Sequence, residues 1–318
     1  MLRCSRRGVA LMLVLWLVVV LGTIALGVAA LVRGQANVVA NVRARAAGRY
    51  AAESGIVAAT WRLRQLLRAA ATPRDQALLF RHLDRVLEDV QQEQLGAARF
   101  QVAVADLNAR IDLNAADEAT LLAFFSQFAQ SREAERLVQA LEDWRDADDV
   151  PRPEGAEAAD YERAGSPFRP PNRPLQRLDE LLRIKGFTQA LADRIAPLVT
   201  VQGDGRVNLN TAPAAVLAAT MGIGPAGASV IESKRRDGDV FTTLAEVWRI
   251  LPQGGGSDGR ALDLFHLTTM PKRVLFISRG WETGTALTHE IQAIYDLDAL
   301  QLAEGPRLVL RFWTERDR

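Results

Sequence analysis

The stretch "RRGVALMLVLWLVVVLGTIALGVAALV", residues 6–32, decides where the rest of the 318-residue chain lies. From Val9 to Val32 no residue is charged, and this run is longer than the ~20 residues that a helix needs to cross a bilayer core. It also exceeds the ~7–15 apolar residues of a secretory signal peptide. The run therefore predicts a membrane-spanning helix over residues 9–32.

Basic residues flank this run unequally. Arg3, Arg6 and Arg7 precede it with no acidic residue among them, whereas Arg33 follows it on the other side. The positive-inside rule places the more basic end in the cytoplasm. We therefore expect a cytoplasmic N-terminus and a globular part beyond the membrane.

The composition excludes several kinds of protein. Lys and Arg number 39 against 38 Asp and Glu, so no global basic excess indicates a nucleic-acid partner. The one cysteine, Cys4, precedes the apolar run, which rules out internal disulfides and cysteine-ligated zinc. No phosphate-binding loop of the G-x-x-x-x-G-K-[ST] kind is present. The histidines are scattered and do not favour a histidine metal site: His82, His266 and His289.

Beyond the apolar run, residues 35–68 are rich in alanine and lack proline, which favours a helix. Apolar residues recur there near helical spacing. We therefore expect one long helix that leaves the membrane and lays an apolar stripe on a globular body. Thr72 or Asp75 is expected to cap a second helix that runs to about Glu93.

Strand patterns lie on both sides of a helical centre. The alternation in "ARFQVAVADL", residues 98–107, predicts a half-buried strand. After residue 261 three more stretches resemble strands, separated by turns: "RVLFISR" (273–279), "ALTHEIQAIYDL" (286–297) and "PRLVLRFW" (306–313). The predicted fold class is therefore α+β, with a long helix on a small antiparallel sheet and a helical domain inserted over residues 112–260.

The centre contains an internal repeat. "RIDLNAADEATLL" (110–122) aligns with "RVNLNTAPAAVLA" (206–218). In each copy we expect a short extended piece to end at an Asn or Thr that caps the next helix. Two copies predict a duplicated helical unit rather than a solenoid, which needs at least three repeats.

Residues 207–250 resemble a helix-hairpin-helix, with its turn at 221–224 and a poorer second copy at 181–195. In DNA-binding hairpins the turn and the next helix N-terminus hold a phosphate, and the basic run 234–236 would add contacts. The absence of a basic residue directly after Gly224 and the acidic surroundings favour a packing role. A membrane-anchored DNA receptor of the competence type stays the alternative function.

The segment 141–162 concentrates carboxylates, with only Arg145 and Arg152 among them: Glu142, Asp143, Asp146, Asp148, Asp149, Glu154, Glu157, Asp160 and Glu162. Crowded carboxylates repel unless they are solvated, protonated or bridged by a cation. Oxygen ligands without His or Cys select calcium over zinc, although the glycine and glutamate of an EF-hand loop are missing. A solvated acidic loop and a two-carboxylate hydrolase site stay open as alternatives.

Taken together and in this order, the motifs resemble the K subunit of type II secretion systems, a minor pseudopilin. The resemblance spans nearly the whole chain. It rests on the basic leader ending at Gly8, the apolar helix from Val9, and five further segments: "AAESG" (51–55), "DLNARIDLN" (106–114), "DWRDADDVPRPEGAE" (143–157), "RPPNRPLQRLDELLRIKGF" (169–187) and "VNLNTAPAAVLAA" (207–219).

The resemblance implies processing at the N-terminus. The prepilin peptidase of the inner membrane would cut between Gly8 and Val9, and the new amino terminus on Val9 would be N-methylated. Typical pilins carry Glu at the fifth mature position, where this chain has Leu13; K subunits lack that Glu. The expected divisions are the leader 1–8, the membrane helix 9–32, the pilin-like helix and first strands 33–111, the inserted helix-hairpin-helix or SAM-like domain 112–260, and the C-terminal β region 261–318.

The family's function is implied in the same way. It would be a non-enzymatic subunit that initiates and caps a periplasmic pseudopilus, which exports folded proteins across the outer membrane. Expected partners are the minor pseudopilins I and J, the other pseudopilus subunits and the inner membrane, and no nucleic acid. The resemblance also implies structural calcium, on ligands that the motif places at Asp143, Asp146, Asp148, Glu157 and Asp160.

Overall fold

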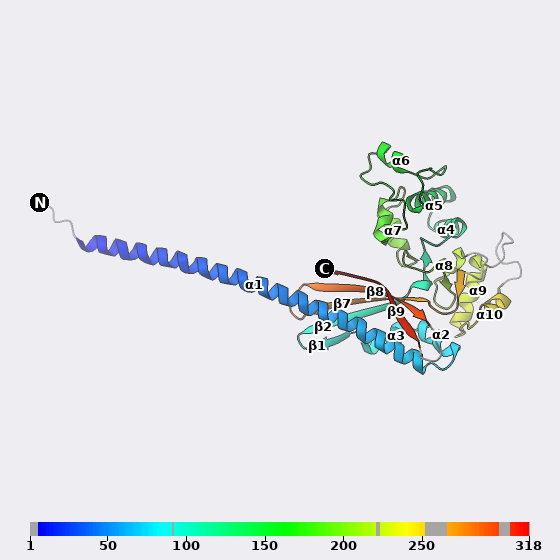
Figure 1. The fold of residues 1–318 in the computed structure, drawn as a ribbon, viewed down its shortest axis with the longest axis horizontal. Helices are drawn as coiled ribbons and strands as arrows, with labels where there is room; N and C mark the ends of the chain where they lie inside the picture. Colours follow the sequence, from blue (N-terminus) through cyan, green and yellow to red (C-terminus); the bar gives the residue numbers. More distant parts are fainter. Residues whose placement is uncertain (1–5, 91, 221–222, 252–265, 299–305, 318) are drawn as a thin grey trace.

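The computed structural model describes residues 6–90, 92–220, 223–251, 266–298 and 306–317. Its longest element is α1, Arg6–Ala69, a continuous helix of 64 residues that extends far beyond the globular part (Figure 1). The most apolar window of α1 has a mean hydropathy of 2.8 and no buried residue, so this helix is long and apolar enough to cross a membrane. From Leu11 onward the first buried residue is Ala44. The prediction of one long helix is confirmed.

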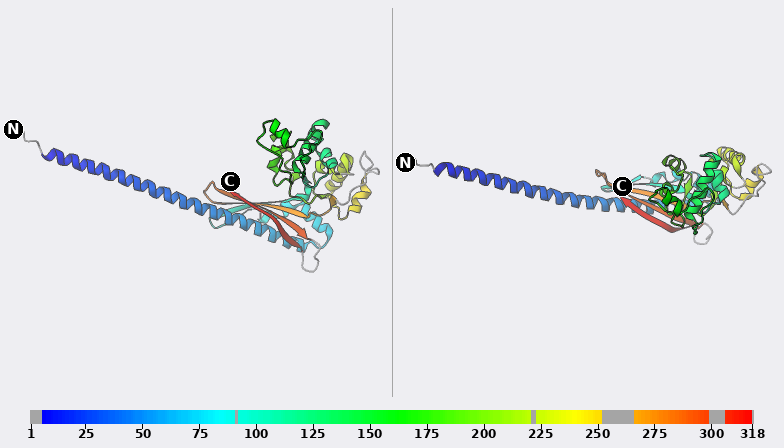
Figure 2. Two further views of the ribbon diagram at one scale, coloured as in Figure 1. Left: turned by 45° about the horizontal axis from the view of Figure 1, so that its top comes forward. Right: turned by 90° about the horizontal axis from the view of Figure 1, so that it is seen from above.

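A five-stranded antiparallel sheet packs against the C-terminal half of α1 (Figure 2). Its order is β1-β2-β7-β8-β9, with bounds Gln92–Leu95, Ala98–Asp106, Arg273–Glu282, Thr288–Asp298 and Arg307–Asp317. Strand β2 pairs along its whole length with β7, from Ala98 opposite Glu282 to Asp106 opposite Val274. Since β2 ends at Asp106 and β7 begins at Arg273, the two strands can pair only if the chain between them leaves the sheet and comes back to it beside β2. Each of the predicted strands is present.

Helix and sheet share one hydrophobic core. Alternation along β2 turns Phe100 and Val102 toward α1, where they join Ile56, Leu63 and Phe276, each 2% exposed or less. Burying such side chains contributes about 1.5–3 kcal/mol apiece before the entropy of folding is counted. The amphipathic outer half of α1 is therefore part of the globular body.

Small residues let α1 approach β7 backbone to backbone. Ala51 and Ala52 are buried on the helix. A Cβ atom at Gly280 would overlap the carbonyl oxygen of Gly48 and the amide nitrogen of Ala52. Glycine is therefore required at position 280 by the close approach of the two backbones.

The connection from α1 to the sheet contains two short helices. Thr72 caps α2, Pro73–Arg81, in a capping box with Asp75: each backbone N–H bonds the other residue's side chain, both at 3.1 Å. The expected single helix to Glu93 is wrong, because His82 leaves helical dihedral angles (ψ 32°) and ends α2. Helix α3, Leu83–Val86, and the 3-10 helix η1, Glu88–Val90, follow before β1 begins at Gln92.

Between β2 and β7 the chain builds a helical region at the end of the molecule opposite the N-terminus (Figures 1 and 2). One hydrophobic core runs through it. Its elements are η2 Leu107–Ala109, β3 Ile111–Asp112, α4 Glu118–Phe125, α5 Ser131–Arg145, α6 Ala158–Arg163, η3 Leu178–Arg183, α7 Gln189–Ile195, β4 Val199–Thr200, β5 Val207–Asn208, α8 Ala214–Ala219, α9 Gly224–Arg236, α10 Leu244–Ile250 and β6 Leu267–Thr268. The predicted α+β class with an inserted helical region is confirmed.

The internal repeat is visible as two copies of one hydrogen-bond pattern. In the first, β3 pairs in parallel with β4, and the Asn114 side chain bonds the backbone of Leu175 and Val201. In the second, β5 pairs in parallel with β6, and Asn210 bonds the backbone of Phe241 and Thr269 in the same way. Each asparagine therefore closes one half of the helical region.

The caps of the two repeat helices differ from the expectation. The residue that caps α4 is Asp117, whose side chain accepts from the Thr120 N–H at 2.8 Å. The N-cap of α8 is Pro213, which makes no side-chain cap bond. The expected Asn or Thr caps are wrong because the asparagines are used to cross-link loops.

Candidate functional site: an acidic loop with unpartnered oxygens

The loop between α5 and α6 carries the predicted acidic cluster. The last turn of α5 holds Asp143, its C-cap is Asp146, and the N-cap of α6 is Glu157. Beneath the loop, the rings of Trp144 and Tyr161 lie 5.8 Å apart and tie the two helices together. The helix ends thus bring carboxylates that are distant in sequence to one place.

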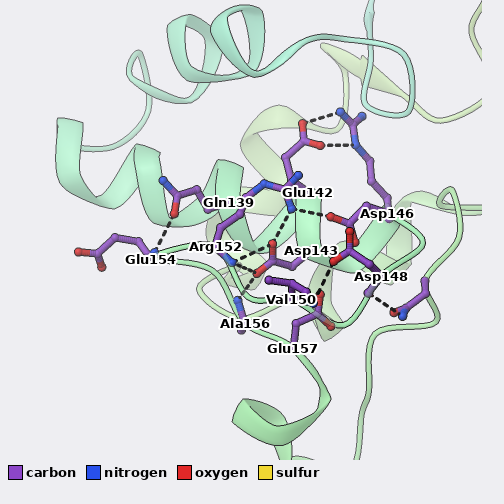
Figure 3. A network of polar contacts seen from close by, with 12 residues as sticks. Gln139, Glu142, Asp143, Asp146, Asp148, Val150, Arg152, Glu154, Ala156 and Glu157 are labelled. Carbon is purple, nitrogen blue, oxygen red and sulfur yellow. Dashed lines mark hydrogen bonds and ion pairs between the residues drawn. The ribbon is translucent and has the colours of Figure 1, made fainter.

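Three of the predicted ligands lie together (Figure 3). Oxygen atoms of Asp146, Asp148 and Glu157 all fall within 4.8 Å of one another. Asp148 is exposed, Asp146 is half-buried and Glu157 is only 3% exposed. This trio offers the kind of oxygen donors that a hard divalent cation takes.

The trio contains buried oxygens without hydrogen bonds. Both carboxylate oxygens of Glu157 and Oδ1 of Asp146 are buried and have no partner among the residues that the structure describes. Burial, and then the charges of Asp143 and Asp146, raise the pKa of Glu157 to about 7. Such atoms are costly to bury unpaired, and a cation would satisfy them. The donor set therefore fits calcium.

The other two predicted ligands have different surroundings. Asp143 is fully buried and accepts from the Ala156 N–H at 2.8 Å and from Nη1 of Arg152 at 2.7 Å. Asp160 accepts from the Glu157 N–H at 3.0 Å and from Arg163 at 2.6 Å. Neither belongs to the group of three in the described chain. In this structure Asp143 shapes the loop, and Asp160 caps the first turn of α6.

Two supporting residues were missed by the sequence analysis. Arg152 bridges Asp143 and Asp146, and Asn172, at a φ of 49°, donates to Asp148 O and Asp149 Oδ1, both at 2.8 Å. The proline-rich setting of Asn172 and the position of Arg152 among acids were the available signals. Neither signal identifies the carboxylate that each residue contacts.

The hairpin-like segment directs much of its basic charge inward. Arg235 donates to the carbonyl of Ala212 at 2.6 Å, and burial lowers the pKa of its guanidinium. Lys234 lies 3.7 Å from Asp239. In the expected turn, residues 221–222 lie outside the described residues, and Gly224 has a φ of 63°. With Arg235 and Lys234 engaged in this way, the segment offers little free charge to a phosphate.

The expected cleavage position lies at the start of α1. That helix begins at Arg6, so both Gly8 and Val9 are in its first two turns, while residues 1–5 lie outside the described part. Cleavage there stays a prediction.

Sequence comparison matches residues 98–204 to the family "Type II secretion system (T2SS), protein K". A Type II secretion system protein K of Pseudomonas aeruginosa is 33% identical over 126 residues, 39% of this chain and 37% of that protein. One from Dickeya chrysanthemi is 30% identical over 160 residues, 47% of this chain and 40% of that protein. The matched part thus spans about two fifths of the length of these relatives.

Comparison of folds points the same way. One chain of "The Crystal Structure of the GspK-GspI-GspJ complex from enterotoxigenic Escherichia coli Type 2 Secretion System" superposes with a TM-score of 0.58 and 16% sequence identity. The superposition covers 85% of this chain and 99% of that chain, so the long helix, the sheet and the helical region belong to one shared fold. The matched family segment, the curated relatives and the shared fold make this chain similar to type II secretion system protein K.

Proposed function

We propose that this protein is the minor pseudopilin that initiates and caps the periplasmic pseudopilus of a type II secretion system. The observation that carries the proposal is the family match over residues 98–204 on a chain with the long helix of a filament subunit. It acts as a structural subunit rather than an enzyme, and the energy for export comes from elsewhere.

The apolar half of α1 suits two successive tasks. Before assembly it anchors the subunit in the inner membrane, with the globular part in the periplasm. After the prepilin peptidase cuts between Gly8 and Val9, and Val9 is methylated, the same helix packs among the helices of the filament. Its exposed apolar side chains, from Leu11 through Val42, support both uses.

The position of the helical region supports a place at the tip. It lies at the end of the molecule opposite the apolar half of α1 (Figure 1), where a subunit stacked above would have to sit. Leu13, in place of the usual glutamate, removes the charge that pairs with a preceding subunit's amino terminus. A subunit with no predecessor needs no such pair.

The solved complex that shares this fold contains GspI and GspJ beside GspK. We infer that the minor pseudopilins I and J are the partners of this chain as well. Exposed aromatic and apolar side chains on the outer half of α1, Tyr50, Val57 and Trp61, support helix-to-helix contact there. The periplasmic part, from about Gln35, should co-purify with the I and J proteins of the same organism in calcium-containing buffer. Recovery of the chain alone would count against the tip assignment.

We also propose that calcium binds the acidic loop through Asp146, Asp148 and Glu157, with Asp143 and Asp160 holding the loop around them. Bound calcium would satisfy the unpartnered oxygens and cross-link the end of α5 to the start of α6.

The calcium proposal predicts a conditional loss of stability. Replacing both ligands, Asp146→Ala with Asp148→Ala, should lower the melting temperature more in calcium than in chelator. In calcium the variant loses the stability that the metal gives the wild-type loop, whereas in chelator it loses the contact of Asp146 with Arg152. Scanning calorimetry with calcium or with a chelator measures this. A matched control is Asp179→Ala, an exposed acid that pairs with Arg177 and lies outside the cluster. Equal melting of the wild type in the two buffers would remove calcium from the account.

A further inference from the structure

The guanidinium of Arg152 lies between two carboxylates of the acidic cluster. Nη1 of Arg152 lies 2.7 Å from Oδ1 of Asp143 and 2.5 Å from Oδ2 of Asp146 (Figure 3). The Arg152 backbone N–H also donates to Asp143, at 3.2 Å. A single positive charge thus bridges two carboxylates that would otherwise repel each other.

Among the described residues, the other carboxylate oxygens of the proposed site have no positive charge bridging them. Glu157 is only 3% exposed, and neither of its carboxylate oxygens has a hydrogen-bond partner in the described part of the chain. Asp146 is served on one side only: Oδ2 accepts from Arg152, while Oδ1 is buried and unpartnered. The two oxygens of the Asp146 carboxylate therefore differ. Oδ2 is bound to Arg152, whereas Oδ1 is free to bind a cation together with Asp148 and Glu157.

A divalent cation bound at those oxygens would lie on one side of the Asp146 carboxylate, with the Arg152 guanidinium on the other side. Charges of the same sign at such separation repel strongly where little water screens them. Arg152 cannot escape this repulsion by losing its proton, because a guanidinium stays protonated in proteins. Relief therefore requires the side chain to move.

Space for that movement exists. A cavity of about 570 Å³ adjoins the loop and is lined by Arg152 together with Pro153, Gly155 and Asp160. The Arg152 side chain is already 34% exposed, whereas Asp143 is fully buried. The guanidinium can therefore turn from Asp146 into a hydrated space while its backbone N–H stays on Asp143.

We propose that Arg152 is a built-in cation that holds the acidic loop together without metal and competes with calcium for Asp146, so that it sets the affinity of the site. This inference rests on the proposed calcium site. It assigns Arg152 a positioning role toward the metal rather than a place among the ligands.

The test is calcium titration of the full-length protein in detergent by isothermal titration calorimetry, after removal of metal with a chelator. Arg152→Gln should bind calcium ~10-fold more tightly or better than the wild type, because no cation has to leave Asp146. The same variant should melt at a lower temperature in chelator, because its acids are no longer bridged. Arg152→Lys should lie between the two, since an ammonium bridges the carboxylates less well than a fork of donors.

A matched control is Arg136→Gln. Arg136 lines the same cavity but pairs with Glu154, at 2.9 Å, which is not among the proposed calcium ligands. Its calcium affinity should equal that of the wild type. If Arg152→Gln is unfolded in chelator and folds on adding calcium, that result also supports the proposal, and Arg152→Lys then supplies the affinity.

Two results separate the failures. If the wild type binds calcium and Arg152→Gln binds it equally or less tightly, Arg152 does not compete and the inference is overturned while the site stands. If the wild type shows no calcium binding, the proposed site itself is wrong and the inference falls with it.

Discussion

At the scale of single residues, buried polar side chains hold the helical region to the sheet. Asp106, the last residue of β2, accepts from the Asn208 amide at 2.8 Å, the Thr211 hydroxyl at 2.6 Å and the Asn108 N–H at 2.8 Å. Asn108 in turn accepts from the backbone N–H of Arg273 at 3.0 Å, where the chain re-enters the sheet. One network therefore joins both ends of the inserted chain.

Asp106 should make stability depend on pH. Burial, offset in part by these hydrogen bonds, raises its pKa from 3.8 to about 6. Between about pH 4 and pH 6 the folded state then binds more protons than the unfolded state, so the free energy of unfolding falls as pH rises. The fall from this group alone is about 3 kcal/mol.

The comparison is between the wild type and Asp106→Asn, each unfolded with urea at several pH values. Charges elsewhere titrate equally in both proteins, so the difference between the two curves isolates Asp106. The wild type should lose stability relative to Asp106→Asn across this window and then stay level. Parallel curves from pH 4 to pH 7 would show that Asp106 is not perturbed.

Residue roles were also the hardest to predict. The repeat in the sequence correctly paired Asn114 with Asn210, but suggested helix caps rather than loop cross-links. A side-chain amide satisfies a cap and a distant backbone equally well, and only the fold decides which backbone is near. The same holds for Arg152, which stands in an acidic segment and contacts two of its carboxylates, Asp143 and Asp146.

At the scale of elements, periodicity was a sufficient guide. The absence of proline and the wealth of alanine predicted the outer half of α1, and alternation predicted β2. Strand-like stretches separated by turns predicted the C-terminal strands. The end of α2 at His82 was missed because no proline or glycine marks it. Local signals therefore located the regular elements. They did not predict that β2 pairs with β7, because that pairing depends on how the chain folds between Asp106 and Arg273.

The contact of α1 with β7 should depend on the glycine in the strand. Gly280→Ala places a methyl group against backbone atoms of Gly48 and Ala52, which cannot rotate away. We expect a loss of about 3 kcal/mol in the free energy of unfolding of the part from about Gln35, measured with urea. An unchanged free energy of unfolding in Gly280→Ala would contradict this packing.

A control substitution lies on α1, and it is compared with Gly280→Ala in the full-length chain by the melting temperature of the globular part. Nothing comes within 4 Å of a Cβ atom built at Gly34, so Gly34→Ala in the full-length chain meets no steric conflict. Alanine there should leave the melting temperature of the globular part unchanged, and it favours the helix by ~1 kcal/mol.

At the scale of the whole molecule, two ends of one helix serve different surroundings. The half toward the N-terminus is apolar and exposed, and the half toward Ala69 packs one face against the sheet (Figure 2). The helical region, with its acidic loop, stands beyond the sheet at the opposite end from the apolar half. This division agrees with the proposed function, in which the subunit is first anchored in a membrane and then placed at a filament tip.

The central claim is tested most directly at the N-terminus of the membrane-associated protein, read by mass spectrometry. The account predicts a chain that begins at Val9 and carries one methyl group on its amino nitrogen. A Gly8→Leu variant analysed in parallel should keep its leader. A wild-type chain that still begins within the first eight residues would be a permanent anchor, and would contradict the pseudopilin function.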